Sequence, residues 1–252
     1  MSRILITGCS SGFGLATAQH FHAQGWDVVA TMRTPQAGLL PEAESLRVLP
    51  LDVTDPDSIA SVVAAAGPID ALVNNAGVGM LNVLEGSDMD KVRELFETNL
   101  FGTFAMIKAF MPQFRERRDG VIVNVSSSVT LKPLPALSVY SASKAAMNAF
   151  TDSFAHEAAL FGVRARTVLP GAAPSTPFAA NVLARMGLDV PPAYGDFVQE
   201  CLARLRSTTE VTEAEDVARA VWRAVTDVDA PARIPAGADA EGWFREASRV
   251  AA

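Results

Sequence analysis

Residues 4–14 read ILITGCSSGFG, and the interpretation of the whole chain starts from this stretch. Its first four residues are typical of a short buried strand, and residues 15–24 predict a helix. The glycines between them favour a tight turn whose backbone N–H groups, with the positive end of the helix, attract a phosphate. The spacing G-x-x-x-G-x-G differs from the commoner G-x-G-x-x-G. A glycine-rich turn without a ligand is therefore the alternative to a dinucleotide site.

Strands and helices alternate along the rest of the chain. Further strands are predicted over residues 27–31, 46–51, 69–73, 121–125 and 163–169, and helices over residues 55–66, 89–114 and 142–160. Nearly continuous apolar strands that alternate with helices predict a parallel sheet covered on both faces. The expected fold class is therefore α/β, a doubly wound Rossmann-type parallel sheet. No linker or repeat interrupts residues 1–252, so we expect a single domain.

Composition and charge argue against several classes of protein. The hydrophobic content of 49% and charged content of 19% predict a globular chain with a large core. A net charge of −7 argues against nucleic acid or an anionic membrane as a partner. Two cysteines and three histidines without ligand spacing give no disulfide framework and no metal site. With neither a signal peptide nor an apolar run of about 20 residues, we expect a cytoplasmic location.

Residues 138–144, SVYSASK, supply candidate acid–base chemistry. Tyr140 stands four residues before Lys144 at the head of the helix expected over residues 142–160, so the two side chains share a helix face. A nearby cation favours the phenolate, so we expect Lys144 to lower the pKa of Tyr140 from about 10 towards neutrality. The alternative is a pair of surface neighbours with no chemical role.

The remaining polar and glycine-containing motifs all follow the ends of predicted strands. The glycine turn follows the first strand, Asp52 the third, residues 74–77 the fourth, Ser127 the fifth and residues 170–171 the sixth. In a parallel α/β sheet, ligands bind beyond the carboxyl ends of the strands. Unrelated motifs would be distributed over both ends of the strands, so we expect these residues to form one site.

Together the motifs resemble the single-domain branch of the short-chain dehydrogenases/reductases. The similarity follows chain order: T-G-x-x-x-G-x-G at 7–14, N-N-A-G at 74–77, Asn99 within TNLFG, Ser127, Y-x-x-x-K at 140–144 and P-G at 170–171.

The resemblance implies a role for each of four catalytic residues. Ser127 would hydrogen-bond the substrate oxygen, and Tyr140 would exchange the proton. Lys144 would bind the nicotinamide ribose and lower the pKa of the tyrosine, while Asn99 would hold a water that links the lysine to solvent. The cofactor would carry the hydride, and the protein would supply placement and proton transfer.

Two of these assignments have alternatives within the sequence. Ser127 has the family spacing to Tyr140, whereas Ser126 and Ser128 point elsewhere if the strand still alternates. Asn99 could instead be a helix-interior asparagine that bonds its local backbone, although asparagine is a poor choice inside a helix.

The end of the second predicted strand indicates the cofactor. An NAD site places an acid about 20 residues beyond the glycines, but residues 30–34 read ATMRT. Met32 stands where an acid would repel a phosphate, and Arg33 can bind the 2′-phosphate of NADP(H). The alternative is that Arg33 is a solvated loop charge.

The resemblance adds Ser11 facing that phosphate, Asp52 at the adenine amino group and Val53 beside the ring. The cofactor-binding set that we predict is Gly8, Ser10, Ser11, Gly12, Phe13, Gly14, Arg33, Asp52, Val53, Asn75, Ala76, Gly77, Tyr140, Lys144, Pro170, Gly171, Ala173 and Ser175.

Residues 176–209 resemble the substrate lid of relatives. Their apolar side chains suggest a hydrophobic substrate, and simple helix packing is the alternative; these side chains are Phe178, Val182, Leu183, Met186 and Phe197. The family often places a threonine beside the nicotinamide amide, and residues 172–176 leave the choice between Ser175 and Thr176 open.

The expected function is an NADP(H)-dependent alcohol dehydrogenase or carbonyl reductase acting on a small-molecule substrate. Residues 233–240, RIPAGADA, resemble members near the hydroxysteroid and retinol dehydrogenases. The alternatives are an epimerase or dehydratase on the same scaffold, and a catalytically silent nucleotide sensor. Apolar residues on several sides of the helices expected over 89–114 and 142–160 predict a homodimer or homotetramer.

Overall fold

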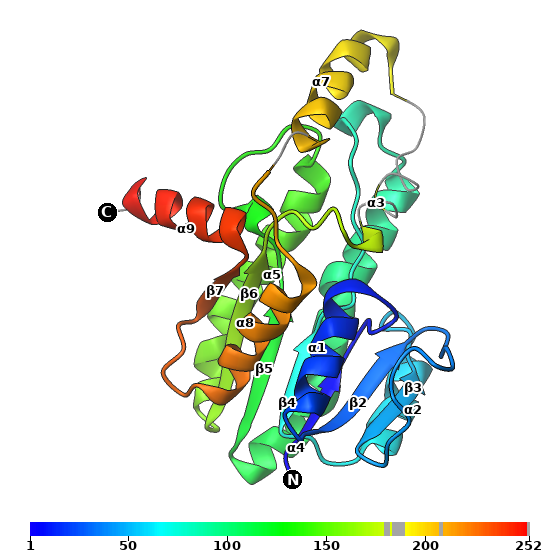
Figure 1. Ribbon diagram of the computed structural model, residues 1–252, viewed down its shortest axis with the longest axis vertical. Helices are drawn as coiled ribbons and strands as arrows, with labels where there is room; N and C mark the ends of the chain where they lie inside the picture. Colours follow the sequence, from blue (N-terminus) through cyan, green and yellow to red (C-terminus); the bar gives the residue numbers. More distant parts are fainter. Residues whose placement is uncertain (179–181, 183–189, 207–208, 251–252) are drawn as a thin grey trace.

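The computed structural model describes residues 1–178, 182, 190–206 and 209–250, and their strands form one parallel sheet (Figure 1). The strand order is β3-β2-β1-β4-β5-β6-β7, so the chain winds outward in both directions from β1. The strands are β1 Arg3–Ile6, β2 Asp27–Met32, β3 Leu46–Pro50, β4 Ala71–Asn74, β5 Gly120–Val125, β6 Val163–Pro170 and β7 Arg233–Ala236. This topology confirms the predicted doubly wound α/β fold.

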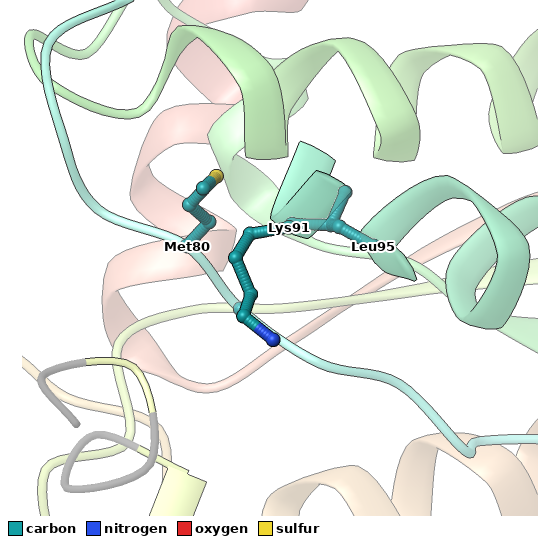
Figure 2. Close-up of a pocket in the computed structure, with 4 residues that line it drawn as sticks. Met80, Lys91 and Leu95 are labelled. Carbon is teal, nitrogen blue, oxygen red and sulfur yellow. The ribbon is translucent and has the colours of Figure 1, made fainter. Parts of the chain in front are cut away.

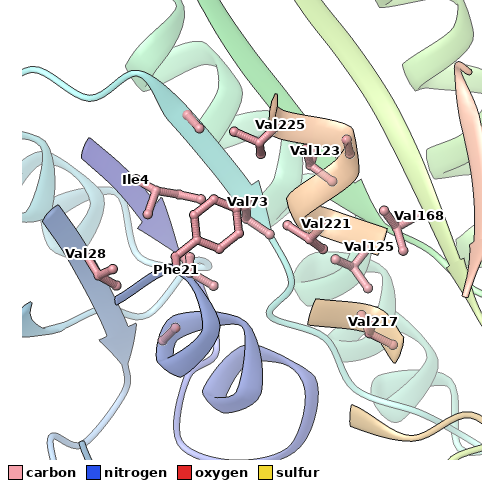
Figure 3. Packing of buried hydrophobic residues seen from close by; sticks show 14 of the residues in the cluster. Ile4, Phe21, Val28, Val73, Val123, Val125, Val168, Val217, Val221 and Val225 are labelled. Carbon is pink, nitrogen blue, oxygen red and sulfur yellow. The ribbon is translucent and has the colours of Figure 1, made fainter. Parts of the chain in front are cut away.

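Helices cover both faces of the sheet because successive strand residues point to opposite sides. On one face, α1 (Gly12–Ala23) and α8 (Ala214–Thr226) pack against Ile4, Val73 and Val123. Figure 3 shows the ring of Phe21 near Ile4 and Val73 on this face. The opposite face is covered by α2 (Pro56–Ala66), α4 (Gly102–Arg117) and α5 (Ser138–Ala159).

The helix predicted over residues 89–114 is interrupted in the structure. It begins as α3 (Met89–Phe96), widens into a π-helical turn, η2 (Glu97–Phe101), and continues as α4. Asn99 lies in the π turn, where its side chain bonds to the backbone of Val78. That contact comes from a distant part of the chain, so helix periodicity could not predict it. Single π turns occur mostly at functional sites.

The C-terminal part of the chain adds elements that our strand assignment did not predict. Strand β7 extends the sheet beside β6, α8 packs on one face, and α9 (Ala238–Val250) follows β7. Helix α7 (Gly195–Arg206) lies near α3 at one end of the molecule (Figure 1). Among the described residues, no helix has the length and apolar character needed to cross a membrane.

Candidate active site

The glycine turn between β1 and α1 depends on the absence of side chains. Gly8 and Gly12 have φ values of +75° and +54°, a region that glycine adopts readily. A Cβ on Gly14 would lie 2.2 Å from the carbonyl oxygen of Gly8. A Cβ on Gly8 would lie 2.8 Å from the Cα of Ala76. The turn is therefore packed tightly on itself and against the loop that follows β4.

Thr7 and Asn75 fasten these two segments together. The Thr7 hydroxyl accepts hydrogen bonds from the backbone N–H groups of Asn75 at 3.0 Å and Ala76 at 2.9 Å. The Asn75 amide donates to the carbonyls of Thr7 at 2.9 Å and Gly8 at 3.1 Å. Asn75, a predicted cofactor residue, thus shapes the glycine turn. Thr7 was missing from the predicted site, although a threonine directly before the first glycine was the available signal.

Ser127 and Tyr140 meet at the carboxyl end of β5. Helix α5 begins at Ser138, earlier than predicted, so Tyr140 lies in its first turn. Tyr140 is 8% exposed, and the Ser127 side chain faces its hydroxyl closely enough to lower the pKa of the phenol. Ser127 also caps the short 3₁₀ turn Ser128–Thr130, accepting from Val129 N–H. Of the three adjacent serines, Ser127 is thus the one whose side chain affects the pKa of the tyrosine.

The protonation of this pair differs from the sequence prediction. Burial raises the pKa of Tyr140 to about 12, and the opposing effect of the Ser127 side chain is smaller. Burial also lowers the pKa of Lys144 to about 8. The expected lowering of the tyrosine pKa by Lys144 is wrong for this structure, because the ammonium donates to the carbonyl of Val125 at 3.0 Å. At neutral pH Tyr140 is therefore a protonated phenol.

Asn99, Gly77 and Lys144 form a second contact group at the same edge. The Asn99 side chain accepts from Val78 N–H at 2.8 Å and donates to the Val78 carbonyl at 2.9 Å. A Cβ on Gly77 would lie 3.2 Å from Asn99 Oδ1 and 3.6 Å from Lys144 Nζ. Asn99 therefore bonds a remote segment, and the alternative of a purely local backbone bond does not hold.

Arg33 and Asp52 lie close enough to interact electrostatically beyond β2 and β3. Burial acts to raise the pKa of Asp52, but hydrogen bonds from Thr54 and the charge of Arg33 bring it below its ordinary value. Arg33 is exposed, whereas Met32 is 2% exposed and belongs to the core. The prediction that an acid at position 32 would face the cofactor is therefore wrong, because that side chain points into the core.

The segment after β6 settles how Ser175 and Thr176 are placed. Ser175 is exposed and donates to Glu213 at 3.0 Å. Thr176 is buried, donates to the Ala173 carbonyl at 2.8 Å, and has its Cβ 3.5 Å from where a Cβ on Gly12 would lie. Thr176, rather than the predicted Ser175, therefore lies against the glycine turn.

The other predicted cofactor residues are distributed around these contacts. Val53 packs against Gly102 at the start of α4, where a Cβ would lie 2.7 Å from its Cγ2. Ser10 and Ser11 lie within the glycine turn, and Phe13 is in the first turn of α1. Pro170 ends β6 and pairs with Ala236 of β7.

Apolar side chains lie close to Tyr140. The ring of Phe178 lies 6.1 Å from that of Tyr140, centroid to centroid. A Cβ on Gly79 would lie 2.7 Å from Phe178 and 2.3 Å from Val182. Phe197, by contrast, is 44% exposed. Two other apolar residues of the expected lid, Leu183 and Met186, are outside the described residues.

A small cavity lies in the same region. Gly79, Met80, Lys91 and Leu95 line it, and Figure 2 shows the last three of these side chains. Its volume is about 10 Å³, which is near the space that one water occupies. Met80, Leu95, Val139 and Tyr140 belong to one apolar cluster. The surroundings of the phenol are therefore apolar and tightly packed.

Comparison with known proteins agrees with this arrangement. A family profile described as short chain dehydrogenase matches residues 2–186. The uncharacterized oxidoreductase YusZ of Bacillus subtilis (strain 168) is 34% identical over 88% of this chain and 84% of its own length. Retinol dehydrogenase 8 of Bos taurus is 40% identical over 67% of this chain, a match that spans 58% of that relative.

A solved structure is similar over almost the whole chain. A short chain dehydrogenase from Burkholderia cenocepacia J2315 in complex with NADP has a TM-score of 0.77 at 27% identity, covering 99% of this chain and 95% of its own.

Titration of Tyr140 tests the protonation that burial imposes. Phenolate absorbance of the wild type minus that of Tyr140→Phe should show no ionisation of Tyr140 between pH 7 and 10, because its pKa is about 12. The raised value also means that the stability contributed by the protonated phenol is present below about pH 10 and is lost as the pH rises through about 12. A difference spectrum with a midpoint near neutrality would restore the sequence prediction.

Proposed function

The chain belongs to the short-chain dehydrogenase family, and from this membership we propose that it interconverts a carbonyl compound and an alcohol with NADP(H). The observation that carries the proposal is the placement of Ser127 next to the buried Tyr140 hydroxyl. It brings a hydrogen-bond donor and a protonated phenol to the carboxyl edge of the sheet, the place where ligands of such sheets bind. NADPH would supply the hydride.

The side chains divide the proton chemistry between them. The Ser127 hydroxyl binds and polarises the carbonyl oxygen of the substrate, and Tyr140 donates its proton to that oxygen as negative charge develops there. Lys144, buried and directed at the Val125 carbonyl, holds a positive charge at this edge of the sheet. Asn99 fixes the loop at Val78, beside Gly77 and the lysine ammonium.

The glycine turn fits a dinucleotide on its own geometry. Helix α1 begins at Gly12 with no acidic residue in its first turn, and Ser11 makes no side-chain cap bond. The first N–H groups of a helix have no partner within it, so they suit a phosphate. Residues 8–14 would hold the pyrophosphate, and Asp52 and Val53 the adenine. Residues 75–77 and 170–176 would lie along the remaining length.

An apolar substrate fits the surroundings of the phenol. Phe178, Met80, Leu95 and Val139 lie around Tyr140, and burial of apolar groups is the main source of affinity in such pockets. The similarity to a retinol dehydrogenase supports the same substrate class. Phe178 packs near the Tyr140 ring, so a substrate that reaches the phenol would contact Phe178 first.

A partly exposed aromatic group at the π turn and on α4 and α5 supports self-association. Phe101 is 49% exposed and contacts Phe104, whose ring lies 4.2 Å from that of Phe150. We expect light scattering to show a dimer or tetramer at micromolar concentration, since an apolar helix face is usually buried. Phe101→Asp should shift the population towards monomer while Leu160→Asp, at another exposed apolar position, does not. A monomeric wild type would contradict this proposal.

Replacing Tyr140 tests the central role. Tyr140→Phe should lower kcat for NADPH-dependent reduction of apolar ketones by about 10² to 10⁴, with dinucleotide affinity largely retained, because only the proton donor is lost. Tyr194→Phe, at the other tyrosine of the chain, is the matched control and should stay active. Unchanged turnover in Tyr140→Phe would refute the assignment. A wild type that yields a product of unchanged redox state would indicate an epimerase or dehydratase, and binding without turnover a nucleotide sensor.

Replacing Arg33 tests the cofactor preference. A charge-assisted contact of Arg33 with the 2′-phosphate is worth about 1.5–3 kcal/mol, so kcat/KM should favour NADPH over NADH by about 10- to 150-fold. Arg33→Ala should weaken NADPH and leave NADH nearly unchanged, and Arg33→Asp should improve NADH. Arg115→Ala, at an exposed arginine of α4, should change neither. Equal use of both cofactors by the wild type would show that Arg33 is a solvated charge.

A further inference from the structure

A buried polar group anchors the segment that follows β6. Asp239, in the first turn of α9, is 2% exposed, and Thr212 is fully buried. One carboxylate oxygen of Asp239 accepts from Ala172 N–H at 2.6 Å. The Thr212 hydroxyl accepts from Gly171 N–H at 2.9 Å, and Thr212 N–H donates to the Ala172 carbonyl at 2.8 Å. The backbone groups of Gly171 and Ala172 are therefore held by hydrogen bonds to Thr212 and Asp239.

Asp239 and Thr212 also bond to each other. The second carboxylate oxygen of Asp239 lies 2.8 Å from the Thr212 hydroxyl, which is also 2.8 Å from the Ala236 carbonyl. A hydroxyl has one proton and so donates to one of these acceptors at a time.

Two glycines make room for this cluster. A Cβ on Gly171 would lie 2.0 Å from Asp239 Oδ1, and a Cβ on Gly237 would lie 2.0 Å from the Thr212 hydroxyl oxygen. Gly237 also has a φ of +95°. Side chains at either position would displace the carboxylate or the hydroxyl, so the contact is built into the backbone of both segments.

The anchored segment crosses the proposed site. It leaves β6 beside β5, whose end leads to Ser127, and reaches the glycine turn where Thr176 packs near Gly12. Thr176 N–H and hydroxyl both donate to the Ala173 carbonyl, which makes the far end of the segment a tight turn. Figure 1 shows β7 and α9 at the opposite edge of the sheet from β3. The segment is therefore held at one end by Asp239 and Thr212 and at the other by the glycine turn.

We propose that Thr212 and Asp239 are positioning residues that hold residues 171–176 in the conformation that receives the nicotinamide half of the dinucleotide. The proposal rests on the proposed function. Both residues lie beyond residue 186, where the match to the family profile ends. They act through the backbone of Gly171 and Ala172, so their loss should affect the nicotinamide half and spare the adenosine half.

The test compares binding of the whole dinucleotide with binding of its adenosine part. For Thr212→Val, which keeps the shape and removes the hydroxyl, the Kd for NADP⁺ should rise about tenfold or more, because hydrogen bonds that fix the segment are lost. The Kd for adenosine 2′,5′-bisphosphate should stay unchanged. Thr212→Ser should restore NADP⁺ affinity, and amide exchange at Gly171 and Ala172 should be faster in Thr212→Val alone.

The chain offers a matched control in β6, the strand that leads into the anchored segment. Thr167 is fully buried in β6, and its hydroxyl has no hydrogen-bond partner among the described residues. Thr167→Val should therefore leave both Kd values and the exchange of residues 171 and 172 unchanged. If Thr212→Val does not fold, Asp239→Asn, which keeps the side-chain volume, carries the same comparison.

The outcomes separate this proposal from the proposed function. Equal NADP⁺ affinity in the wild type and in Thr212→Val overturns the positioning role. Equal weakening of NADP⁺ and adenosine 2′,5′-bisphosphate also overturns it, since that pattern indicates a general loss of structure. If the wild type binds the bisphosphate and NADP⁺ with equal affinity, the nicotinamide half contributes nothing to binding. This result also overturns the positioning role. A wild type that binds neither compound refutes the proposed function itself.

Discussion

The close approach of the glycine turn to the loop after β4 is the constraint from which the site follows. Gly8 and Gly14 have no room for a Cβ there. The side chains of Thr7 and Asn75 make hydrogen bonds that join the two segments. Because β1 and β4 are neighbours at the centre of the sheet, this contact fixes where the two halves of the chain meet. Gly77, Asn99 and Lys144 are then placed by the same loop. One packed contact therefore sets the position of the expected phosphate site and of the loop that lies beside Lys144.

The sequence predicted the parts of this arrangement that depend on local pattern. The apolar runs predicted strands β1 to β6 to within a few residues. Asp55 caps α2, as expected of a capping residue that is followed by a proline. The π turn at Asn99 was not predictable, because it depends on a bond to Val78 across the fold. The inward direction of Met32 was also missed, since both faces of β2 are covered and period-two alternation gives no contrast.

The error in the tyrosine pKa has a similar origin. Helical spacing correctly placed Tyr140 and Lys144 on one helix, but it carries no information on burial or on where the ammonium points. A charge held near the phenol could have lowered its pKa, because the attraction between such a charge and the phenolate is worth a few kcal/mol. The ammonium is instead directed at the Val125 carbonyl, and burial dominates for both groups. Desolvation penalises each charged form, so it raises the pKa of the tyrosine and lowers the pKa of the lysine.

The order of the two pKa values then sets the direction of proton movement. Tyr140, with a pKa of about 12, holds its proton more tightly than Lys144, with a pKa of about 8. A phenolate formed at Tyr140 would therefore be a stronger base than the neutral amine of Lys144. The phenol is thus the stable form of Tyr140 at neutral pH. In the proposed reaction a phenol can donate its proton to a carbonyl oxygen, whereas alcohol oxidation would first require that proton to be removed from an apolar site.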